Sequence, residues 1–251
     1  MIPTFDKLQP KVVLGVAAHP DDLDFGASGT MAKFVRSGAD VYYLILTDGG
    51  SGTEDRKITP AQLTKIRHEE QRNAGKVLGL KDVYFCDYHD GALQNTLEVK
   101  REVVKIIRQV KPDVVVTMDP SVLYSADLGF INHPDHRAAG QAALDAVFPL
   151  ARDHLAFPEL LDEGYEPHKT QTVLLMNMER NNFAVDITDV LDTKFNALAK
   201  HASQVPTDLA GIKERFTERA AQAGKVYGYK YAETFMRVDV YSPPTNKAFR
   251  K

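Results

Sequence analysis

Residues 11–26 read "KVVLGVAAHPDDLDFG" and join an apolar run to an abrupt cluster of polar side chains. The first half, "KVVLGVAA", is apolar at both alternating positions, as a strand buried on both faces of a sheet must be. The second half brings His19 and three carboxylates, which are Asp21, Asp22 and Asp24. In open parallel sheets, ligands bind just beyond the carboxyl ends of the strands. The stretch therefore predicts both a buried parallel sheet and the position of a site.

The rest of the chain repeats this alternation of short apolar runs with longer amphipathic stretches. Further strands are expected at residues 40–47, 82–88, 113–119 and 171–178. Helices are expected at residues 27–37, 60–79 and 95–110, where apolar residues recur at three- and four-residue spacing. This pattern predicts the α/β fold class, as a single-domain, Rossmann-like three-layer sandwich with a mostly parallel sheet and helices on both faces.

Size and composition bound the protein classes that remain. The chain has 251 residues, of which 43% are hydrophobic, so we expect one domain over residues 1–251 with a frayed tail at 242–251. A net charge of −3 provides no broad basic field, so nucleic acid is not an expected partner. No run approaches the roughly 20 apolar residues of a membrane span, and the N-terminus does not read as a signal peptide.

The single cysteine, Cys86, cannot form an internal disulfide, which suits a reducing compartment. We therefore expect a cytoplasmic protein. The sequence leaves both a monomer and a homo-oligomer open.

Four of the histidines follow predicted strands in the sequence. His19 follows the first strand, His89 follows the third, and His133 and His136 lie beyond the fourth. The tetrapeptides "HPDD" and "HPDH" each place two polar groups three residues apart, where two side chains can reach one point. Two such clusters at adjacent strand ends could share a metal ion.

Two imidazoles and one carboxylate leave the fourth position of a tetrahedral zinc ion open, as catalytic zinc sites do. We predict His19, Asp22 and His136 as the ligands. Asp21 could then accept a proton from the metal-bound water, and His133 could act on the other side of a substrate carbonyl. This set makes hydrolysis of an amide feasible.

Other interpretations fit the same residues. "HPDD" could be a helix N-cap in which Asp22 or Asp24 binds a helix amide, and the second cluster could be capped by Asn132 or His133. The ligand set also describes the facial triad of non-haem iron oxygenases. We favour the hydrolase because strands alternate with helices and because a second carboxylate lies beside the predicted ligand.

A family resemblance covers most of the chain. It rests on these motifs, in order: "AHPDD" with "LDFG", "SGT", "TDGG", "IRHEEQRNAGKVLGL", "DYHDGAL", "HPDHRAAG", "HASQ" and "YAETF". With them the chain resembles the zinc-dependent N-acetylglucosaminide deacetylases, also called PIG-L or LmbE-like. That family includes the N-deacetylases of mycothiol, bacillithiol and glycosylphosphatidylinositol synthesis and diacetylchitobiose deacetylase.

The resemblance implies a metal-dependent hydrolase that removes an acetyl or other acyl group from the nitrogen of an N-acetylglucosamine-type sugar or its conjugate. The implied cofactor is Zn²⁺, with Fe²⁺ as the alternative. An amidase of a thiol-sugar conjugate is the alternative activity within the family. Residue by residue, the resemblance implies His19, Asp22 and His136 as ligands. It also implies Asp21 as general base and His133 as the group that stabilises the oxyanion or protonates the leaving amine.

The resemblance further implies Arg67, Glu70 and Asp90 as substrate-binding residues. From the residues alone, Arg67 and Glu70 could equally form an exposed ion pair within a helix, and Asp90 could cap a turn.

The chain also departs from the family pattern, because Asp24 stands where many members have Glu. Asp135 could orient His133 or His136, or it could equally be a first-turn carboxylate that the helix dipole favours. The stretches 120–132 and 152–170 are expected to be long loops that determine the substrate.

Overall fold

A twisted sheet runs through the centre of the protein. The computed structural model describes residues 8–126, 129–176, 180–205 and 209–240. Seven strands lie in the order β3-β2-β1-β4-β7-β9-β8. They are β1 (Val12–Ala17), β2 (Asp40–Thr47), β3 (Asp82–Tyr88), β4 (Val114–Met118), β7 (Thr172–Met176), β8 (Phe183–Asp186) and β9 (Ala232–Asp239). The first five are parallel, and β9 is antiparallel to both β7 and β8.

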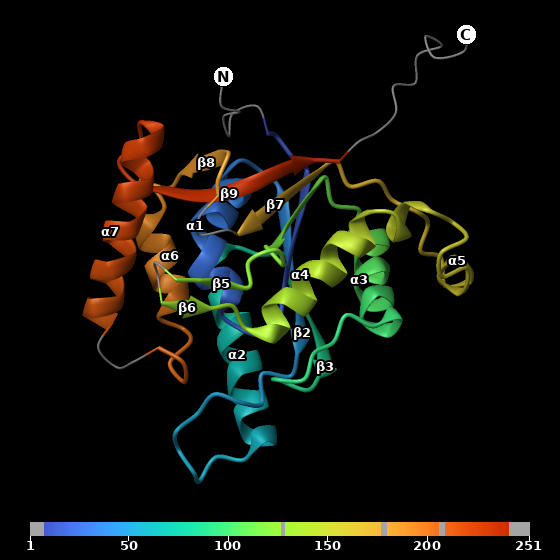
Figure 1. The fold of residues 1–251 in the computed structure, drawn as a ribbon, viewed down its shortest axis with the longest axis horizontal. Helices are drawn as coiled ribbons and strands as arrows, with labels where there is room; N and C mark the ends of the chain where they lie inside the picture. Colours follow the sequence, from blue (N-terminus) through green and yellow to red (C-terminus); the bar gives the residue numbers. More distant parts are fainter. Residues whose placement is uncertain (1–7, 127–128, 177–179, 206–208, 241–251) are drawn as a thin grey trace.

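Helices cover both faces of the sheet (Figure 1). One face carries α1 (Asp22–Arg36), α2 (Pro60–Leu78), α6 (Leu191–Leu198) and α7 (Leu209–Tyr227). The other face carries α3 (Leu97–Val110), α4 (Pro134–Val147), the short 3-10 helix η2 (Leu150–Arg152) and α5 (Glu159–Asp162). The predicted α/β class, with a mostly parallel sheet between two helical layers, is confirmed.

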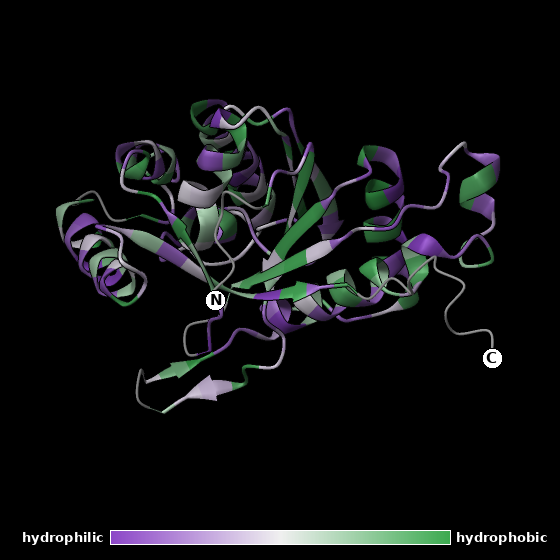
Figure 2. Ribbon diagram, turned by 90° about the horizontal axis from the view of Figure 1, so that it is seen from above, coloured by the Kyte–Doolittle hydropathy of each residue, from purple (hydrophilic) through white to green (hydrophobic). Residues whose placement is uncertain are grey.

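Strand β1 shows why both of its alternations are apolar. Val13 and Ala17 pack into the core beneath α1 and α2, whereas Leu14 and Val16 pack into the core beneath α3 and α4. All four side chains are fully buried. The central strands are accordingly hydrophobic along most of their length (Figure 2). A strand covered on both sides has no solvent face on which polar residues could alternate.

Some predicted boundaries were wrong. The first helix begins at Asp22, five residues before the predicted start, because the acidic residues Asp22 and Asp24 form its first turn, where the helix dipole favours negative charge. The stretches expected to be loops contain the hairpin β5 (Tyr124–Ser125) and β6 (Phe130–Ile131), and the short helix α5; η2 ends at Arg152, where the second stretch begins. The hairpin projects from the body (Figure 2) and leads into α4.

The proposed domain limits stay a prediction. Residues 242–251, expected to be frayed, lie outside the described residues, as do residues 177 and 178 of the fifth predicted strand.

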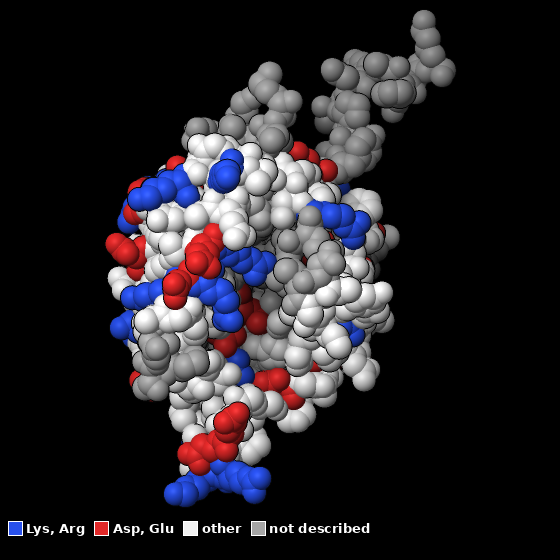
Figure 3. Space-filling model, turned by 60° about the vertical axis from the view of Figure 1, so that its left-hand side comes forward, with Lys and Arg blue, Asp and Glu red and all other residues white. Residues whose placement is uncertain are grey.

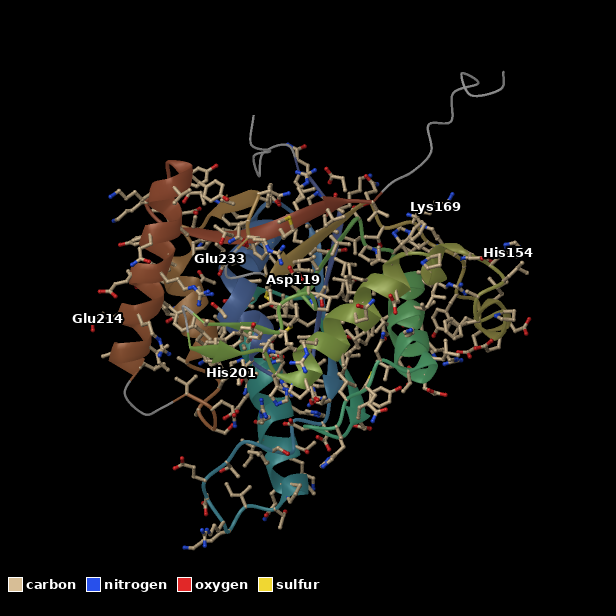
Figure 4. The ribbon with its side chains drawn as sticks, viewed as in Figure 1. Asp119, His154, Lys169, His201, Glu214 and Glu233 are labelled. Atoms are coloured by element: carbon tan, nitrogen blue, oxygen red, sulfur yellow. The ribbon has the colours of Figure 1, made fainter. Side chains whose placement is uncertain are left out.

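A buried ion pair joins α1 to the C-terminal part of the chain. Lys194 of α6 and Glu233 of β9 lie 2.7 Å apart and are nearly inaccessible to solvent. Glu233 accepts hydrogen bonds from the N–H groups of Gly29 and Thr30, and Lys194 donates to two carbonyls earlier in α1. The pair thus binds backbone groups in the interior of the helix, where side chains rarely intervene. Figure 4 shows Glu233 beside α1.

Removing one partner of this pair should strongly destabilise the fold. We expect Lys194→Met to lower the free energy of unfolding by about 3–5 kcal/mol, because it leaves a buried carboxylate unpaired. The matched control is Lys33→Met, whose partner Asp189 is largely exposed, and its loss should stay below about 1 kcal/mol. Equilibrium urea unfolding measures both. Equal losses would contradict the role given to the buried pair.

Candidate metal centre and active site

Polar side chains from separate parts of the chain meet at the carboxyl ends of the parallel strands. His19 follows β1, Asp90 follows β3, and His133 and His136 lie at the start of α4. Strand β1 lies between β2 and β4, where the strand order reverses and where open α/β sheets bind their ligands. One face of the molecule is hollowed, and acidic side chains are visible inside the hollow (Figure 3).

The two tetrapeptides converge. The ring centroid of His19 lies 4.8 Å from that of His133 and 5.3 Å from that of His136. One nitrogen of each of these three rings lies within 4.8 Å of the others. Asp22 places one oxygen 3.1 Å from Nε2 of His136 and the other 3.4 Å from Nδ1 of His19. The structure therefore brings together the three predicted ligands and His133.

The electrostatics of this cluster favour positive charge. Burial alone would lower the pKa of His19, but hydrogen bonds and negative charge from Asp22 and Asp90 outweigh it and raise the pKa to about 11. Burial would likewise raise the pKa of Asp22, yet His136 and His19 hold it well below its usual range. Imidazole nitrogens beside an ionised carboxylate form a donor set that fits a divalent metal ion such as zinc.

Two further carboxylates contact Nε2 of His19. Nε2 of His19 lies 3.2 Å from an oxygen of Asp90 and 3.2 Å from an oxygen of Asp135. Asp135 is fully buried and also accepts hydrogen bonds from the N–H groups of Gly91 and Leu93. Carboxylates in this position fix the orientation of a metal-binding imidazole. The sequence suggested such a role for Asp135, but toward His133 or His136.

Asp21 has an unusual backbone. It is the N-cap of α1 with φ 98° and ψ −29°, and its side chain makes no capping hydrogen bond. An N-cap aspartate normally accepts a helix N–H, which contributes about 0.5–2 kcal/mol. The left-handed conformation of a residue with a side chain costs about 1–3 kcal/mol. The Asp21 carboxylate is thus left available for the site. Burial and the charge of Asp22 raise its pKa to about 7, against the opposing effect of Arg67.

The capping interpretation, in which Asp22 or Asp24 binds a helix amide, is wrong. Asp22 accepts the N–H of His19, which precedes the helix. Asp24 accepts hydrogen bonds from the side chains of Gln71 and His201.

His133, by contrast, does cap its helix. Its Nδ1 accepts the N–H of Asp135, whereas the Asn132 side chain binds the Val122 carbonyl. A ring nitrogen that accepts carries no proton, so the neutral ring holds its proton on Nε2. Burial and the charge of His19 lower the pKa of His133, which favours this neutral form.

Arg67 and Glu70 are buried, so the interpretation of the two as an exposed ion pair is wrong. Arg67 donates to three backbone carbonyls, lies 3.2 Å from Asp90 and lies 3.5 Å from Asp21. Both carboxylate oxygens of Glu70 accept hydrogen bonds from Ser203. Arg67 thus contacts side chains of the site, and Glu70 holds the neighbouring turn at Ser203. Their binding of substrate stays a prediction.

Residues 14–147 match the PIG-L family, described as GlcNAc-PI de-N-acetylase, and this range contains both tetrapeptides. The chain belongs to the PIG-L family. A diacetylchitobiose deacetylase from Thermococcus kodakarensis is 37% identical over 224 residues, which cover 89% of this chain and 81% of that relative. A probable N-acetyl-alpha-D-glucosaminyl L-malate deacetylase 2 from Bacillus anthracis is 26% identical, over 82% of this chain and 87% of the relative.

A similar solved structure supports the fold. The N,N'-diacetylchitobiose deacetylase from Pyrococcus horikoshii, complexed with its inhibitor MPG, matches with a TM-score of 0.84 and 32% identity. The match covers 95% of this chain and 89% of that one.

The metal content of two variants distinguishes the predicted roles of the two histidines of "HPDH". If His136 is a ligand and His133 is not, dialysed His136→Ala should lose its bound metal, while His133→Ala should retain it and lose activity. Elemental analysis of both variants beside the wild type measures this directly. Full metal retention by His136→Ala, or equal loss from both variants, would contradict the predicted ligand set.

Proposed function

We propose that this PIG-L protein is a metal-dependent N-deacetylase. It would remove an acetyl or other acyl group from the nitrogen of an N-acetylglucosamine-type sugar or its conjugate. The convergence of "HPDD" and "HPDH" is the observation that carries the proposal. The Asp21 carboxylate makes no capping hydrogen bond and lies 3.5 Å from Arg67. Two relatives, a diacetylchitobiose deacetylase and a probable N-acetyl-alpha-D-glucosaminyl L-malate deacetylase, support the substrate class.

For the metal we propose Zn²⁺ held by His19, Asp22 and His136, with Fe²⁺ as the alternative. Two imidazoles and one carboxylate are a donor set of catalytic zinc sites. When bound, such an ion polarises the acyl carbonyl and lowers the pKa of a water molecule to about 7.

Asp21 would take the proton that the water loses on attack. Its pKa, raised to about 7 by burial and by the charge of Asp22, suits a base that works near neutral pH. The same carboxyl group can then return the proton to the nitrogen as the C–N bond breaks, which releases acetate and a free amine. Asp21 is buried and contacts Arg67, so the charged form it must reach has a nearby cation.

His133 would stabilise the negative charge that develops on the acyl oxygen. Its Nδ1 is occupied by the N–H of Asp135, so the proton on Nε2 is the one available to donate.

We also propose that Asp90, Arg67 and Glu70 serve the substrate. Arg67 would do so through Asp21 and Asp90, and Glu70 through the turn that contains Ser203.

Two alternative activities differ in their support. An amidase of a thiol-sugar conjugate stays open, because it would use the same groups. The ligand set alone also fits a non-haem iron oxygenase, but the mostly parallel sheet and PIG-L membership speak against that activity. A cytoplasmic location stays a prediction, and both a monomer and a homo-oligomer stay open. Among the described helices, none has both the length and the apolar character needed to cross a bilayer.

Asp21→Asn should separate chemistry from metal binding. We expect it to retain metal and to lose about two to four orders of magnitude in kcat, the range for general acid–base groups. Steady-state kinetics with elemental analysis of the same sample measures both. A variant that works near the wild-type rate would show that another group is the base.

A substrate panel tests the activity itself. Free N-acetylglucosamine, its inositol and malate glycosides, diacetylchitobiose and thiol conjugates would be incubated with the enzyme, and the free amine measured. We expect release from at least one of them, abolished by a chelator and restored by Zn²⁺. Release that a chelator does not affect would refute the metal-dependent mechanism.

A further inference from the structure

A chain of buried hydrogen bonds runs from the backbone of Asp21 to His201. The Asp21 N–H donates to Oε1 of Gln71 over 2.9 Å, and Nε2 of Gln71 donates to Oδ2 of Asp24 over 2.7 Å. Nε2 of His201 lies 2.8 Å from the same oxygen of Asp24. All four residues are buried. The proposed chemistry uses none of Gln71, Asp24 and His201.

These hydrogen bonds determine how Gln71 is oriented. A backbone N–H can only donate, so it must face Oε1, and the amide nitrogen then faces Asp24. Because an ionised carboxylate can only accept, His201 donates to Asp24 as well. Gln71 projects from α2, Asp24 lies in α1, and His201 follows α6 beside α2 (Figure 4). One backbone atom of the site is thereby tied to α2, to α1 and to the segment that follows α6.

That atom belongs to the residue whose backbone is strained. An N-cap residue in its usual extended conformation directs its side chain to the N–H groups of the first helical turn. In the left-handed conformation of Asp21 the carboxylate makes no such bond. If the Asp21 N–H lost its partner, the backbone could rotate to the usual conformation. The carboxylate could then cap the N–H of Leu23 or Asp24 and would leave the site.

We propose that Gln71 is a positioning residue for Asp21. Its carboxamide, fixed by Asp24 and His201, holds the Asp21 N–H in the left-handed conformation that keeps the carboxylate out of helix capping and in the site. The functional consequence rests on the proposed role of Asp21 as base.

The first test is Gln71→Leu, which removes both hydrogen bonds with little change in volume. We expect kcat to fall about 100-fold, the effect of a displacement of about 1 Å, while KM stays within about twofold. Metal content should equal that of the wild type. The matched control is Asn73→Leu on the same helix, whose amide accepts a hydrogen bond from exposed Lys76, and its kcat should be unchanged.

A double-mutant cycle distinguishes positioning from general structural damage. In an Asp21→Asn background, Gln71→Leu should change kcat by less than about threefold, because the group that it positions is already disabled. A loss of about 100-fold in both backgrounds would show that Gln71 acts independently of Asp21, and would overturn the proposal.

A reciprocal exchange provides a second route if Gln71→Leu does not fold. Gln71→Glu places two carboxylates in contact and should lose activity. Adding Asp24→Asn restores a hydrogen bond of reversed direction, from the new amide to the new carboxylate. The same amide faces Nε2 of His201, which must then accept, so the His201 ring changes to the neutral tautomer with its proton on Nδ1. With these bonds formed, kcat should return to within about threefold of the wild type. A folded, metal-loaded double variant without recovery would refute the proposal.

A crystal structure of Gln71→Leu, which leaves the Asp21 N–H without an acceptor, decides the point without activity. We expect Asp21 to have a negative φ and its carboxylate to accept a first-turn N–H. A left-handed Asp21 with its carboxylate still in the site would overturn the proposal. If the wild type releases no amine from any substrate, the proposed function fails, and this structure still tests the positioning role.

Discussion

Negative charge buried around His19 is the constraint on which the site depends. Asp22, Asp90 and Asp135 each lie within 3.4 Å of a ring nitrogen of His19, and each side chain is at most 9% exposed. Carboxylates that lose their hydration and lie close together must be paired with cations or donors, or the fold loses stability. Arg67 compensates Asp90 on one side. The imidazoles, and the divalent ion that we propose, would compensate the rest, so metal binding and folding should be coupled.

Three carboxylates in four residues have three environments. Asp21 is held in a left-handed turn before the helix, so its side chain is absent from the cap. Asp22, one residue later, turns toward the imidazoles of His19 and His136 and stays ionised. Asp24 lies two residues further around α1 and faces Gln71 on α2. Successive helix positions differ by about 100° in direction, so one short segment serves the metal, the base and the support of the base.

The sequence predicted what depends on local pattern. Strands apolar at both alternations had to lie in the middle of the sheet, and polar residues behind them had to meet at one edge, as His19 and His136 do. The antiparallel strands β8 and β9 were not predicted. Strand β9 is only partly buried and carries Glu233 and Arg237, so it lacks the uniform apolar pattern of the central strands.

Contacts between distant segments were beyond the sequence. Asp135 was expected to serve a histidine of its own tetrapeptide, but it contacts His19, which is 116 positions away. The angle at which α4 approaches the sheet decides this pairing. That approach is close, because a Cβ at Gly140 would lie 2.4 Å from the carbonyl oxygen of Met118 on β4. The close approach results from the packing of α4 against β4, and the spacing of residues in the sequence does not predict it.

His133 shows that helix capping and a catalytic role are compatible in one side chain. Its Nδ1 caps α4 through the N–H of Asp135, and this bond requires the proton of the neutral ring to be on Nε2. A histidine without such a partner could exchange between two tautomers, and one of them would present a lone pair to the developing oxyanion. The helix therefore selects the tautomer that the proposed chemistry needs. At "HPDD" the two roles exclude each other. If the Asp21 carboxylate capped α1, it would no longer be available as the proposed base.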